Sequence, residues 1–481
     1  MLKTTRRQLL TTVAGARCAT LAGSPGGTRP NVVMFMTDDH GAWATGASGC
    51  GEIHTPNVDH LAAEGAQFTR AFACTPVCSP SRVTYLTGAI PSRHGLQDWL
   101  LPEDSYGPTT RRWYQGLTPY SEILARNGYT LGMCGKWHMG EDDRAQAGFS
   151  YWATVPGGGG PYWNAEFVKN RAPVKNTGFK TDAMTDYALE FLERQKGPFY
   201  LLMPFYAPHT PYDSQPEQDR KWYQNSDFIC FPNTPMHPWQ TGKPVHHGNR
   251  DSKLAYSALI SGVDRSVGRI LKRLEELRLR ENTLVIFTAD QGWNAGHHGV
   301  WGKGNGTWPF NMYEESLRVP LIWNHPGRIR SGLRPSVMVS SYDFFPSILD
   351  YLGITAAPDP RRVGRSYVPF LRGESPAWRT RLYFEYAYVR AIRTETVKYV
   401  ERTSEFPSEL FDLEADPGET RNVIDDPAHR KQLQDLRAEL HGFFKQAGAP
   451  PLENWRTTTK QNLPKYSRAA LQPTHKSADH Q

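Results

Sequence analysis

The stretch Asn31-Val32-Val33-Met34-Phe35-Met36-Thr37 is almost continuously apolar and stops abruptly at Asp38-Asp39-His40. Runs of the same kind recur at residues 130–134, 199–205 and 283–289. Between these runs, apolar residues at spacings of three and four predict helices over residues 181–194 and 256–279. Because apolar strands that alternate with helices are typical of a sheet buried on both faces, we predict an α/β fold with a large, mostly parallel sheet flanked by helices.

Polar side chains follow each predicted strand at the point where it ends. These segments are Asp38-Asp39-His40, Gly135-Lys136-Trp137-His138, Pro208-His209 and Asp290-Gln291. Each one alone is also typical of a helix cap, a turn or a solvated surface group. Since ligands of open α/β sheets bind beyond the carboxyl ends of the strands, four such segments together predict one functional site.

The acids at these strand ends suit a hard divalent cation. Asp38, Asp39 and Asp290 offer carboxylate oxygens and Gln291 offers an amide oxygen. The chain must turn after Thr37 for both neighbouring acids to reach one ion, because successive residues of a strand point to opposite faces. Oxygen ligands of this kind favour Ca²⁺ over zinc, with Mg²⁺ as the alternative.

The overall charge bears on the class of partner. The 481 residues carry a formal net charge of +7, and four unopposed positive residues lie within the first 28: Lys3, Arg6, Arg7 and Arg17. This balance is too weak to indicate a nucleic-acid partner, although it is compatible with a basic pocket for an anionic substrate. No run of 18 or more apolar residues occurs, so no transmembrane helix is expected.

Residues 1–28 are expected to form an export signal. The segment Thr4-Thr5-Arg6-Arg7-Gln8-Leu9-Leu10 and the small residues after it resemble a twin-arginine signal, which predicts a periplasmic or secreted protein. The alternative is a basic tail, since Arg17 interrupts the short apolar region.

We expect a main domain over residues 29–375 and a smaller α+β subdomain over residues 376–450. Within the subdomain, strands of an antiparallel sheet are predicted at residues 381–388, 389–394 and 397–402. An amphipathic helix is predicted at residues 431–446. Residues 451–481 show little apolar periodicity and are predicted to be a tail.

The segment Cys78-Ser79-Pro80-Ser81-Arg82 places a thiol, a proline and a guanidinium close together. A single buried cysteine is more often a small apolar residue than a nucleophile, and Cys74 could instead form a disulfide with Cys78. The six cysteines include no Cys-x-x-Cys pair, which disfavours a zinc ribbon. The segment resembles the Cys-x-Pro-x-Arg motif of the sulfatases, in which a formylglycine-generating maturation enzyme oxidises the cysteine to an aldehyde.

The resemblance to the sulfatase family continues along most of the chain. It includes the segments at residues 38–39, 135–140, 207–211, 290–299, 301–304, 313–320 and 409–413. It implies an alkaline-phosphatase-like fold in which residues 29–375 are the sulfatase catalytic domain and the C-terminal subdomain packs beside the main sheet. Gln291 departs from the family, where Asn or His is common, but its side-chain oxygen can still bind a cation.

The resemblance also implies two groups of functional residues. The expected metal ligands are Asp38, Asp39, Cys78, Asp290 and Gln291, and the expected catalytic residues are Cys78, Arg82, Lys136, His138, His209 and Lys303. The three basic side chains of the second group surround the negative charge of the sulfate. In the mechanism that the resemblance implies, the hydrated aldehyde would attack sulfur, His209 would protonate the leaving alcohol, and His138 would assist the release of sulfate.

Two other functions share these residues. A phosphonate or phosphodiester hydrolase would use a similar metal and cationic pocket, and a binding protein would keep the pocket without turnover. The substrate expected for the sulfatase is a sulfated carbohydrate or another sulfated small molecule. We expect the loops at residues 151–162, with four consecutive glycines, and 222–239 to border the pocket and to select the leaving group.

Four further histidines are weaker candidates for a role in the chemistry. We expect His40 and His54 to shape the rim of the pocket or to satisfy backbone groups. His94 is expected to brace the segment that carries Cys78, and His298 to orient the loop that carries Lys303.

Overall fold

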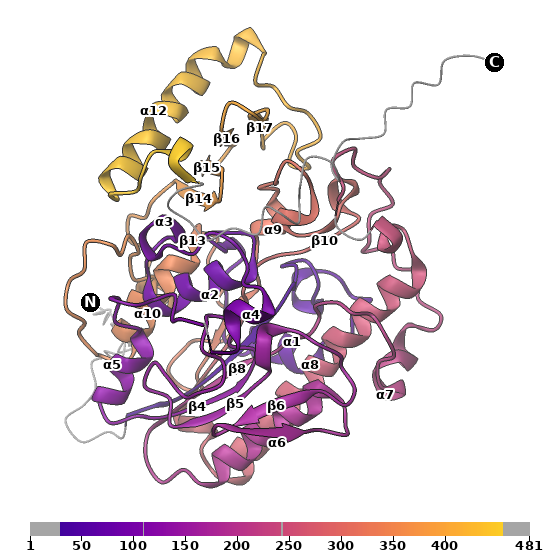
Figure 1. Ribbon diagram of the computed structural model, residues 1–481, viewed down its shortest axis with the longest axis vertical. Coiled ribbons are helices and arrows are strands. Elements are labelled where there is room, and N and C mark those ends of the chain that lie inside the picture. Colours follow the sequence, from indigo (N-terminus) through magenta and orange to yellow (C-terminus); the bar gives the residue numbers. More distant parts are fainter. Residues whose placement is uncertain (1–28, 109, 242–243, 456–481) are drawn as a thin grey trace, which may run out of the picture.

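The computed structural model describes residues 29–108, 110–241 and 244–455. The predicted export signal lies outside the described residues, and so does the predicted tail from residue 456 onward. The described chain forms a large sheet between two layers of helices, with a smaller sheet and one long helix at one end of the molecule (Figure 1).

The large sheet has nine strands in the order β2-β12-β9-β1-β8-β4-β5-β6-β7. Its centre is parallel and consists of β9 (Thr283–Ala289), β1 (Asn31–Thr37), β8 (Phe199–Pro204), β4 (Thr130–Gly135) and β5 (Tyr151–Thr154). Antiparallel strands close the two edges: β12 (Leu321–Asn324) with β2 (Ala66–Gln67), and β6 (Glu166–Lys169) with β7 (Ala172–Lys175). The predicted fold class is confirmed, and the four apolar runs of the sequence are four of the five central strands.

Both faces of β1 are buried, which explains its continuous apolar sequence. Val33 and Phe35 pack into the core beneath one helical layer, while Val32 and Met34 pack into the core beneath the other. The first layer contains α1 (Pro56–Ala63), α6 (Lys180–Glu193) and α8 (Arg250–Glu276), and the second contains α2 (Cys78–Thr87), α5 (Tyr120–Arg126) and α10 (Phe344–Tyr351).

The two long predicted helices are α6 and α8, and α8 begins six residues before its predicted start. It does so because the side-chain oxygen of Asn249 accepts the backbone N–H of Ser252 and thereby caps the first turn. Short elements complete the main domain: α3 (Pro91–His94), α4 (Pro102–Ser105), α7 (Glu217–Arg220), α9 (Glu314–Leu317), α11 (Val368–Leu371), β3 (Ala71–Phe72) paired with β13 (Val339–Ser340), and β10 (Asn294–Ala295) paired with β11 (Trp301–Gly302).

The C-terminal region forms a separate antiparallel sheet covered by one helix. Its strands are β14 (Leu382–Tyr386), β15 (Val389–Arg393), β16 (Val397–Arg402) and β17 (Glu409–Asp412), and the helix is α12 (Arg430–Gln446). Leu436, Leu440 and Phe444 of α12 are buried against the sheet. The three strands and the helix predicted here are present, and β17 is a fourth strand that the prediction did not include.

Buried ion pairs attach this sheet to the main domain. Glu314 in α9 lies 3.1 Å from Arg393 and 3.2 Å from Lys398, and Lys398 also contacts Glu419. Removing one partner of such a buried pair leaves an uncompensated charge, which strongly destabilises a fold. These contacts therefore fix the smaller sheet in place beside the main sheet.

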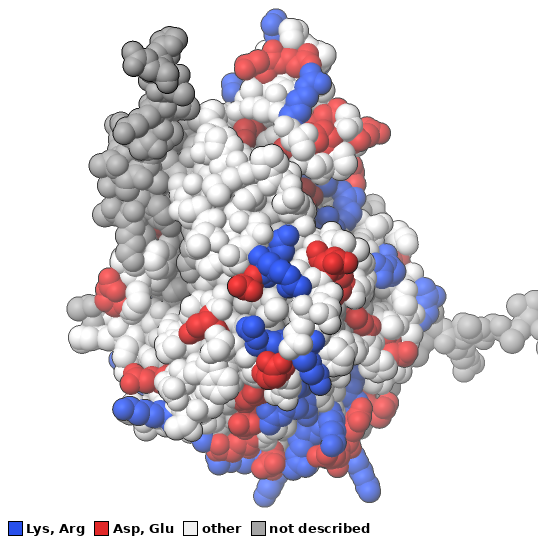
Figure 2. All heavy atoms as spheres, turned by 90° about the vertical axis from the view of Figure 1, so that its right-hand side faces the viewer, with Lys and Arg blue, Asp and Glu red and all other residues white. Residues whose placement is uncertain are grey.

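The face seen in Figure 2 carries charges of both signs without one large patch of either sign. Lys, Arg, Asp and Glu are interspersed over its lower half and again at its top, and a broad uncharged area lies between these regions. On this face the excess positive charge of the chain is not gathered into one surface. Within the described part of the chain, no helix has both the length and the apolar character needed to cross a membrane.

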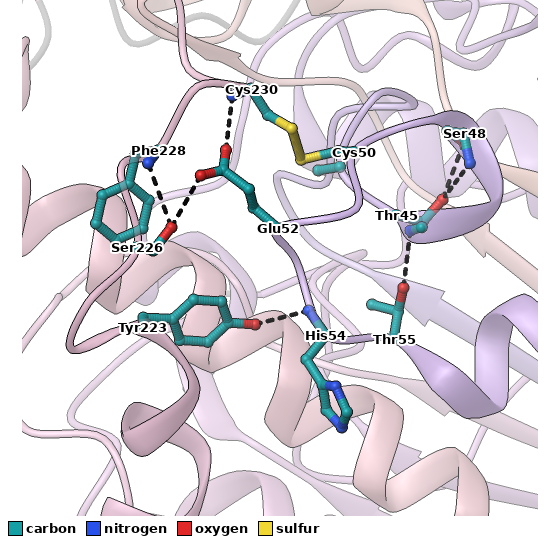
Figure 3. The surroundings of a disulfide bond; sticks show 12 residues. Thr45, Ser48, Cys50, Glu52, His54, Thr55, Tyr223, Ser226, Phe228 and Cys230 are labelled. Carbon is teal, nitrogen blue, oxygen red and sulfur yellow. Dashed lines mark hydrogen bonds between the residues drawn. A yellow bond between two sulfur atoms is a disulfide. The ribbon is translucent and has the colours of Figure 1, made fainter.

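A disulfide joins Cys50 to Cys230, two loop residues separated by 180 positions (Figure 3). Beside it, the carboxylate of Glu52 accepts hydrogen bonds from the hydroxyl of Ser226 and from the backbone N–H of Cys230. The alternative pairing of Cys74 with Cys78 is not formed, since both have free thiols. Sequence reasoning did not find the true pair, because nothing local links two cysteines so far apart.

Replacing Cys50 and Cys230 together by alanine should lower the free energy of unfolding by about 2–4 kcal/mol, because the bond closes a long loop in the unfolded chain. Thermal unfolding with and without a reductant measures the effect. The reductant should lower the melting temperature of the wild type and leave that of the double variant unchanged. Equal melting temperatures for the oxidised wild type and the double variant would contradict the stabilising role.

Candidate active site

The carboxyl ends of β1, β4, β8 and β9 meet at one cavity of about 550 Å³. Six of the sequence-predicted residues line it: Asp39, Cys78, Lys136, His138, His209 and Lys303. The other four, Asp38, Arg82, Asp290 and Gln291, are buried and joined to the lining residues by hydrogen bonds and ion pairs. The structure therefore brings all ten predicted residues together, as parallel strands with a common edge require.

Helix α2 places Cys78 and Arg82 on the same side of the site. Cys78 is the first residue of this helix, and Arg82 follows one turn later, so that the two side chains share a face. The Arg82 guanidinium donates hydrogen bonds to Asp290 at 2.8 Å, to Asp38 at 3.1 Å and to the carbonyl of Lys136 at 2.6 Å. Because the N-terminus of a helix carries a partial positive charge, the position of Cys78 favours an anion beside it.

The neighbouring residues Asp38 and Asp39 reach the same site because the backbone turns between them. Asp39 has a φ of +66°, in the left-handed region that ends the strand geometry. Asp38 then lies 2.5 Å from Nζ of Lys136, and Asp39 lies 2.7 Å from Nζ of Lys303. The turn that the adjacent acids required is thus present.

The buried charges shift one another's pKa values in opposite directions. Burial alone would raise the pKa of Asp38, but Lys136 and Lys303 hold it well below its usual range. Burial and the nearby charge of Asp38 raise the pKa of Asp290 to about 7, against the attraction of Arg82. Burial also raises the pKa of the Cys78 thiol, against the charges of the two lysines. A further cation beside these acids would keep both carboxyls ionised.

The carboxylates of Asp38 and Asp39 indicate where such a cation fits. The side-chain nitrogen of Gln291 donates to Asp38 at 3.2 Å and to Asp39 at 2.6 Å, whereas its oxygen has no hydrogen-bond partner among the described residues. Carboxylate oxygens of Asp38 and Asp39 and a ring nitrogen of His209 lie within 4.8 Å of one another. These carboxylate oxygens suit a hard divalent cation, and a half-turn of the Gln291 amide would present its oxygen, in place of the nitrogen, to the same two acids.

The hydrogen bonds of the two histidines define their tautomers. Nε2 of His138 lies 2.9 Å from the carbonyl of Leu100, so Nε2 carries a proton and Nδ1 accepts from the hydroxyl of Ser79 at 3.1 Å. Nδ1 of His209 lies 2.5 Å from the carbonyl of Thr210 and donates to it, which leaves Nε2 3.7 Å from Asp39. Burial lowers the pKa of His138 well below its usual value and lowers that of His209 to about 4, against the attraction of Asp39.

The weaker histidine candidates lie away from the cavity. The His40 ring contacts the hydroxyl of Thr37 and the carbonyl of Ala44, and the ring of His54 stacks on Trp222. His94 contacts Thr84 of α2, and His298 lies 2.6 Å from Glu315. None of the four lines the described cavity.

The walls of the cavity come from loops, and only part of them was predicted. Gly157, Gly158 and Gly159 line it, as expected for the glycine-rich loop, but residues 222–239 contribute none of its described lining. Sequence reasoning missed several aromatic side chains: Trp99, Tyr206, Trp293 and Trp301. Two of them could have been found from the sequence, since Tyr206 lies two residues after the end of β8 and Trp301 lies in the segment 301–304 together with Lys303.

Comparison with known proteins identifies the class of protein as a hydrolase of sulfuric esters in the alkaline-phosphatase superfamily. Residues 30–354 match the family described as "Sulfatase", and residues 296–446 match "N-sulphoglucosamine sulphohydrolase, C-terminal". Because the first match covers more than half of the chain, the chain belongs to the sulfatase family.

Relatives with similar sequences or structures share most of this chain. It is 27% identical to an N-acetylglucosamine-6-O-sulfatase of Bacteroides thetaiotaomicron, with 87% of each chain covered. It is 29% identical to an ulvan-active sulfatase of Formosa agariphila, over 88% of this chain and 82% of the relative. A solved structure in complex with its substrate D-glucosamine-2-N,6-O-disulfate has a TM-score of 0.75 and 24% identity, and covers 89% of this chain and 99% of its own. At that level of identity, the third likeness supports the fold.

Replacing Asp290 by asparagine should weaken Ca²⁺ binding by about tenfold or more, because a charged oxygen beside the ion is lost. Calorimetric titration of the metal-free protein with Ca²⁺, repeated with Mg²⁺, measures the change and decides between the two ions. Asp264→Asn is the matched control, since Asp264 is also buried but bonds to Asn57 and to the backbone of Val58, away from the cavity. Equal affinities for the wild type and Asp290→Asn would remove Asp290 from the ligand set.

Proposed function

We propose that the protein hydrolyses sulfate esters of carbohydrates by means of a formylglycine made from Cys78. The observation that carries this proposal is the position of Cys78, which begins a helix, lines the cavity and is flanked by the charges of Lys136 and Lys303. The proposal for the substrate is supported by the relatives, one named for N-acetylglucosamine-6-O-sulfate hydrolysis, another for activity on ulvan, and the third bound to a sulfated glucosamine.

The basic side chains account for binding of the sulfate group. Lys136 and Lys303 line the cavity on either side of the acids and neutralise charge on the sulfate oxygens. Arg82 does not line the cavity and acts by holding Asp38 and Asp290 in place. The aldehyde hydrate at position 78 would supply an oxygen nucleophile and a second hydroxyl from which the aldehyde is regenerated.

The two histidines suit the proton transfers of an ester hydrolysis. His209 is held through Nδ1 on the carbonyl of Thr210, so its Nε2 is the atom that would take up a second proton, which the charge of Asp39 favours, and pass it to the leaving alcohol. His138 has its proton on Nε2, bonded to Leu100, and therefore offers Nδ1 as an acceptor beside the Cys78 segment. Each ring is thus anchored to a carbonyl through one nitrogen, and the other nitrogen is the atom that would exchange protons.

The acids would hold the cation. Asp38, Asp39, Asp290 and Gln291 are the proposed Ca²⁺ ligands, with Mg²⁺ as the alternative and the oxygen at position 78 as a further ligand. Bound there, the ion supplies positive charge that stabilises the reacting sulfate and the oxygen nucleophile.

We further propose that the protein works outside the cytoplasm. The twin-arginine-like segment at its N-terminus and the disulfide between Cys50 and Cys230 both suit an oxidising compartment. A formylglycine-generating enzyme is then the partner required for maturation.

Mass spectrometry of the tryptic peptide Ala71–Arg82 tests whether Cys78 is converted. The unmodified peptide contains two cysteines and takes up two alkyl groups from iodoacetamide. The converted peptide should take up one, at Cys74, and should have a lower mass because an aldehyde replaces the thiol. Two alkyl groups on every peptide from an active preparation would contradict the formylglycine.

Replacing Cys78 by alanine should lower kcat/KM for an aryl sulfate by about 1,000-fold or more, because the nucleophile is removed. Cys74→Ala, a change of a free thiol on the same peptide, should retain activity. Full activity of Cys78→Ala would exclude Cys78 as the nucleophile. Faster hydrolysis of bis(4-nitrophenyl) phosphate than of 4-nitrophenyl sulfate by the mature wild type would favour the phosphodiesterase alternative.

A further inference from the structure

Lys180 is a buried lysine that the proposed chemistry does not use. It is the first residue of α6 and only 1% of its side chain surface is exposed. Its Nζ donates hydrogen bonds to the carbonyls of Gly160 at 2.9 Å and Gly159 at 3.1 Å. The same nitrogen lies 4.0 Å from the centre of the Tyr206 ring and 5.4 Å from that of Tyr162.

This position is unfavourable for a positive charge. Among the described residues, no carboxylate lies within ion-pair distance of Lys180, and the positive end of the α6 dipole is at the same place. Burial and the charge of Lys136 lower the pKa of Lys180 to about 7, and Asp213 opposes this only from a distance. A methionine would fill a buried site of this size without the desolvation cost of an ammonium group. Packing alone therefore does not explain why a lysine occupies this site.

The carbonyls that Lys180 holds belong to Gly159, which lines the active-site cavity, and to Gly160, which follows it in the same loop. Gly157, Gly158 and Gly159 line the cavity, and the backbone of Gly158 lies directly against His138. A Cβ atom at Gly158 would approach the His138 ring to 2.2 Å, and the residue has a φ of +68°. This loop can pack on the ring only as glycine, and glycine is also the most flexible residue. A flexible segment in this position needs an external anchor to define the wall.

The nearer tyrosine ring that Lys180 contacts also belongs to this cavity. Tyr206 lines the cavity, and its ring centre lies 4.9 Å from that of His209. Its hydroxyl donates a hydrogen bond to the carbonyl of Thr210, the same oxygen that fixes Nδ1 of His209. Lys180 thus contacts the segment beside each of the two histidines.

We propose that Lys180 is a positioning residue that anchors the glycine loop and Tyr206, and thereby sets the shape of the cavity wall that receives the leaving group. The part that concerns substrate rests on the proposed sulfatase function, whereas the anchoring of the loop does not. The charge acts through two backbone carbonyls and an aromatic face, so it takes no part in the chemistry at sulfur.

Lys180→Met tests the anchor, because methionine keeps the volume and removes the donors. In hydrogen exchange measured by mass spectrometry, the backbone amides of residues 157–160 should exchange faster by about tenfold or more, while the exchange rates in α8 should not change. KM for N-acetylglucosamine-6-sulfate should rise by about tenfold, with a smaller change in kcat. Lys180→Arg, which keeps the charge and the donors, should restore most of both properties.

Lys169→Met is the matched control, because Lys169 also lies over a tyrosine ring but forms an ion pair with Glu190 outside the cavity. It should leave exchange at residues 157–160 and KM unchanged. If residues 157–160 of Lys180→Met exchange at the wild-type rate, Lys180 does not anchor the loop. If they exchange faster but KM is unchanged, the anchor does not affect the cavity.

If Lys180→Met does not fold, Lys180→Gln takes its place, because glutamine keeps one donor group. Exchange at residues 157–160 should then be intermediate, and a wild-type rate in this variant would overturn the proposal. An inactive wild type would defeat the sulfatase proposal, while the exchange experiment would still decide the anchor.

Discussion

The guanidinium of Arg82 connects the helix that carries Cys78 with the ends of three strands of the central sheet. It bonds to Asp38 after β1, to the carbonyl of Lys136 after β4, and to Asp290 after β9. All of these groups are almost completely buried, so the bonds form where the dielectric constant is low and an unpaired charge is costly. The guanidinium suits this task because it is planar and always charged, and its N–H groups can donate to all three acceptors at once. The position of Cys78 relative to the strand ends follows from this one group.

The same cluster explains how a buried site can be both stable and ready to bind an anion. Three acids, Asp38, Asp39 and Asp290, face three bases, Arg82, Lys136 and Lys303, in direct ion pairs. The two sets balance, which limits the cost of burying them. A divalent cation held by the acids would then leave the array with a net positive charge. A sulfate monoester is negatively charged, so the proposed cation would favour substrate binding as well as reaction.

The sequence predicted those parts of the site that depend on strand ends. Continuous apolar runs identify buried parallel strands, and their carboxyl ends must meet at one edge, so Asp38, Lys136, His209 and Asp290 could be assigned to one site before any geometry was known. Their roles stay proposals. The disulfide between Cys50 and Cys230 and the anchor at Lys180 depend on contacts between loops far apart in the chain, and no local period encodes such contacts. β17 was missed for a related reason, since four residues are too few for a pattern.

The floor and the walls of the cavity are therefore specified in different ways. The floor consists of strand ends whose positions follow from the register of the parallel sheet, so changes there affect the chemistry. The walls consist of loops, where Gly158 permits close packing on His138 only because it has no Cβ, and where Lys180 supplies an anchor that glycine cannot. Loops tolerate substitution more readily than buried strands. Changes in the walls can accordingly alter which leaving group fits, while the proposed sulfate site at the floor stays the same.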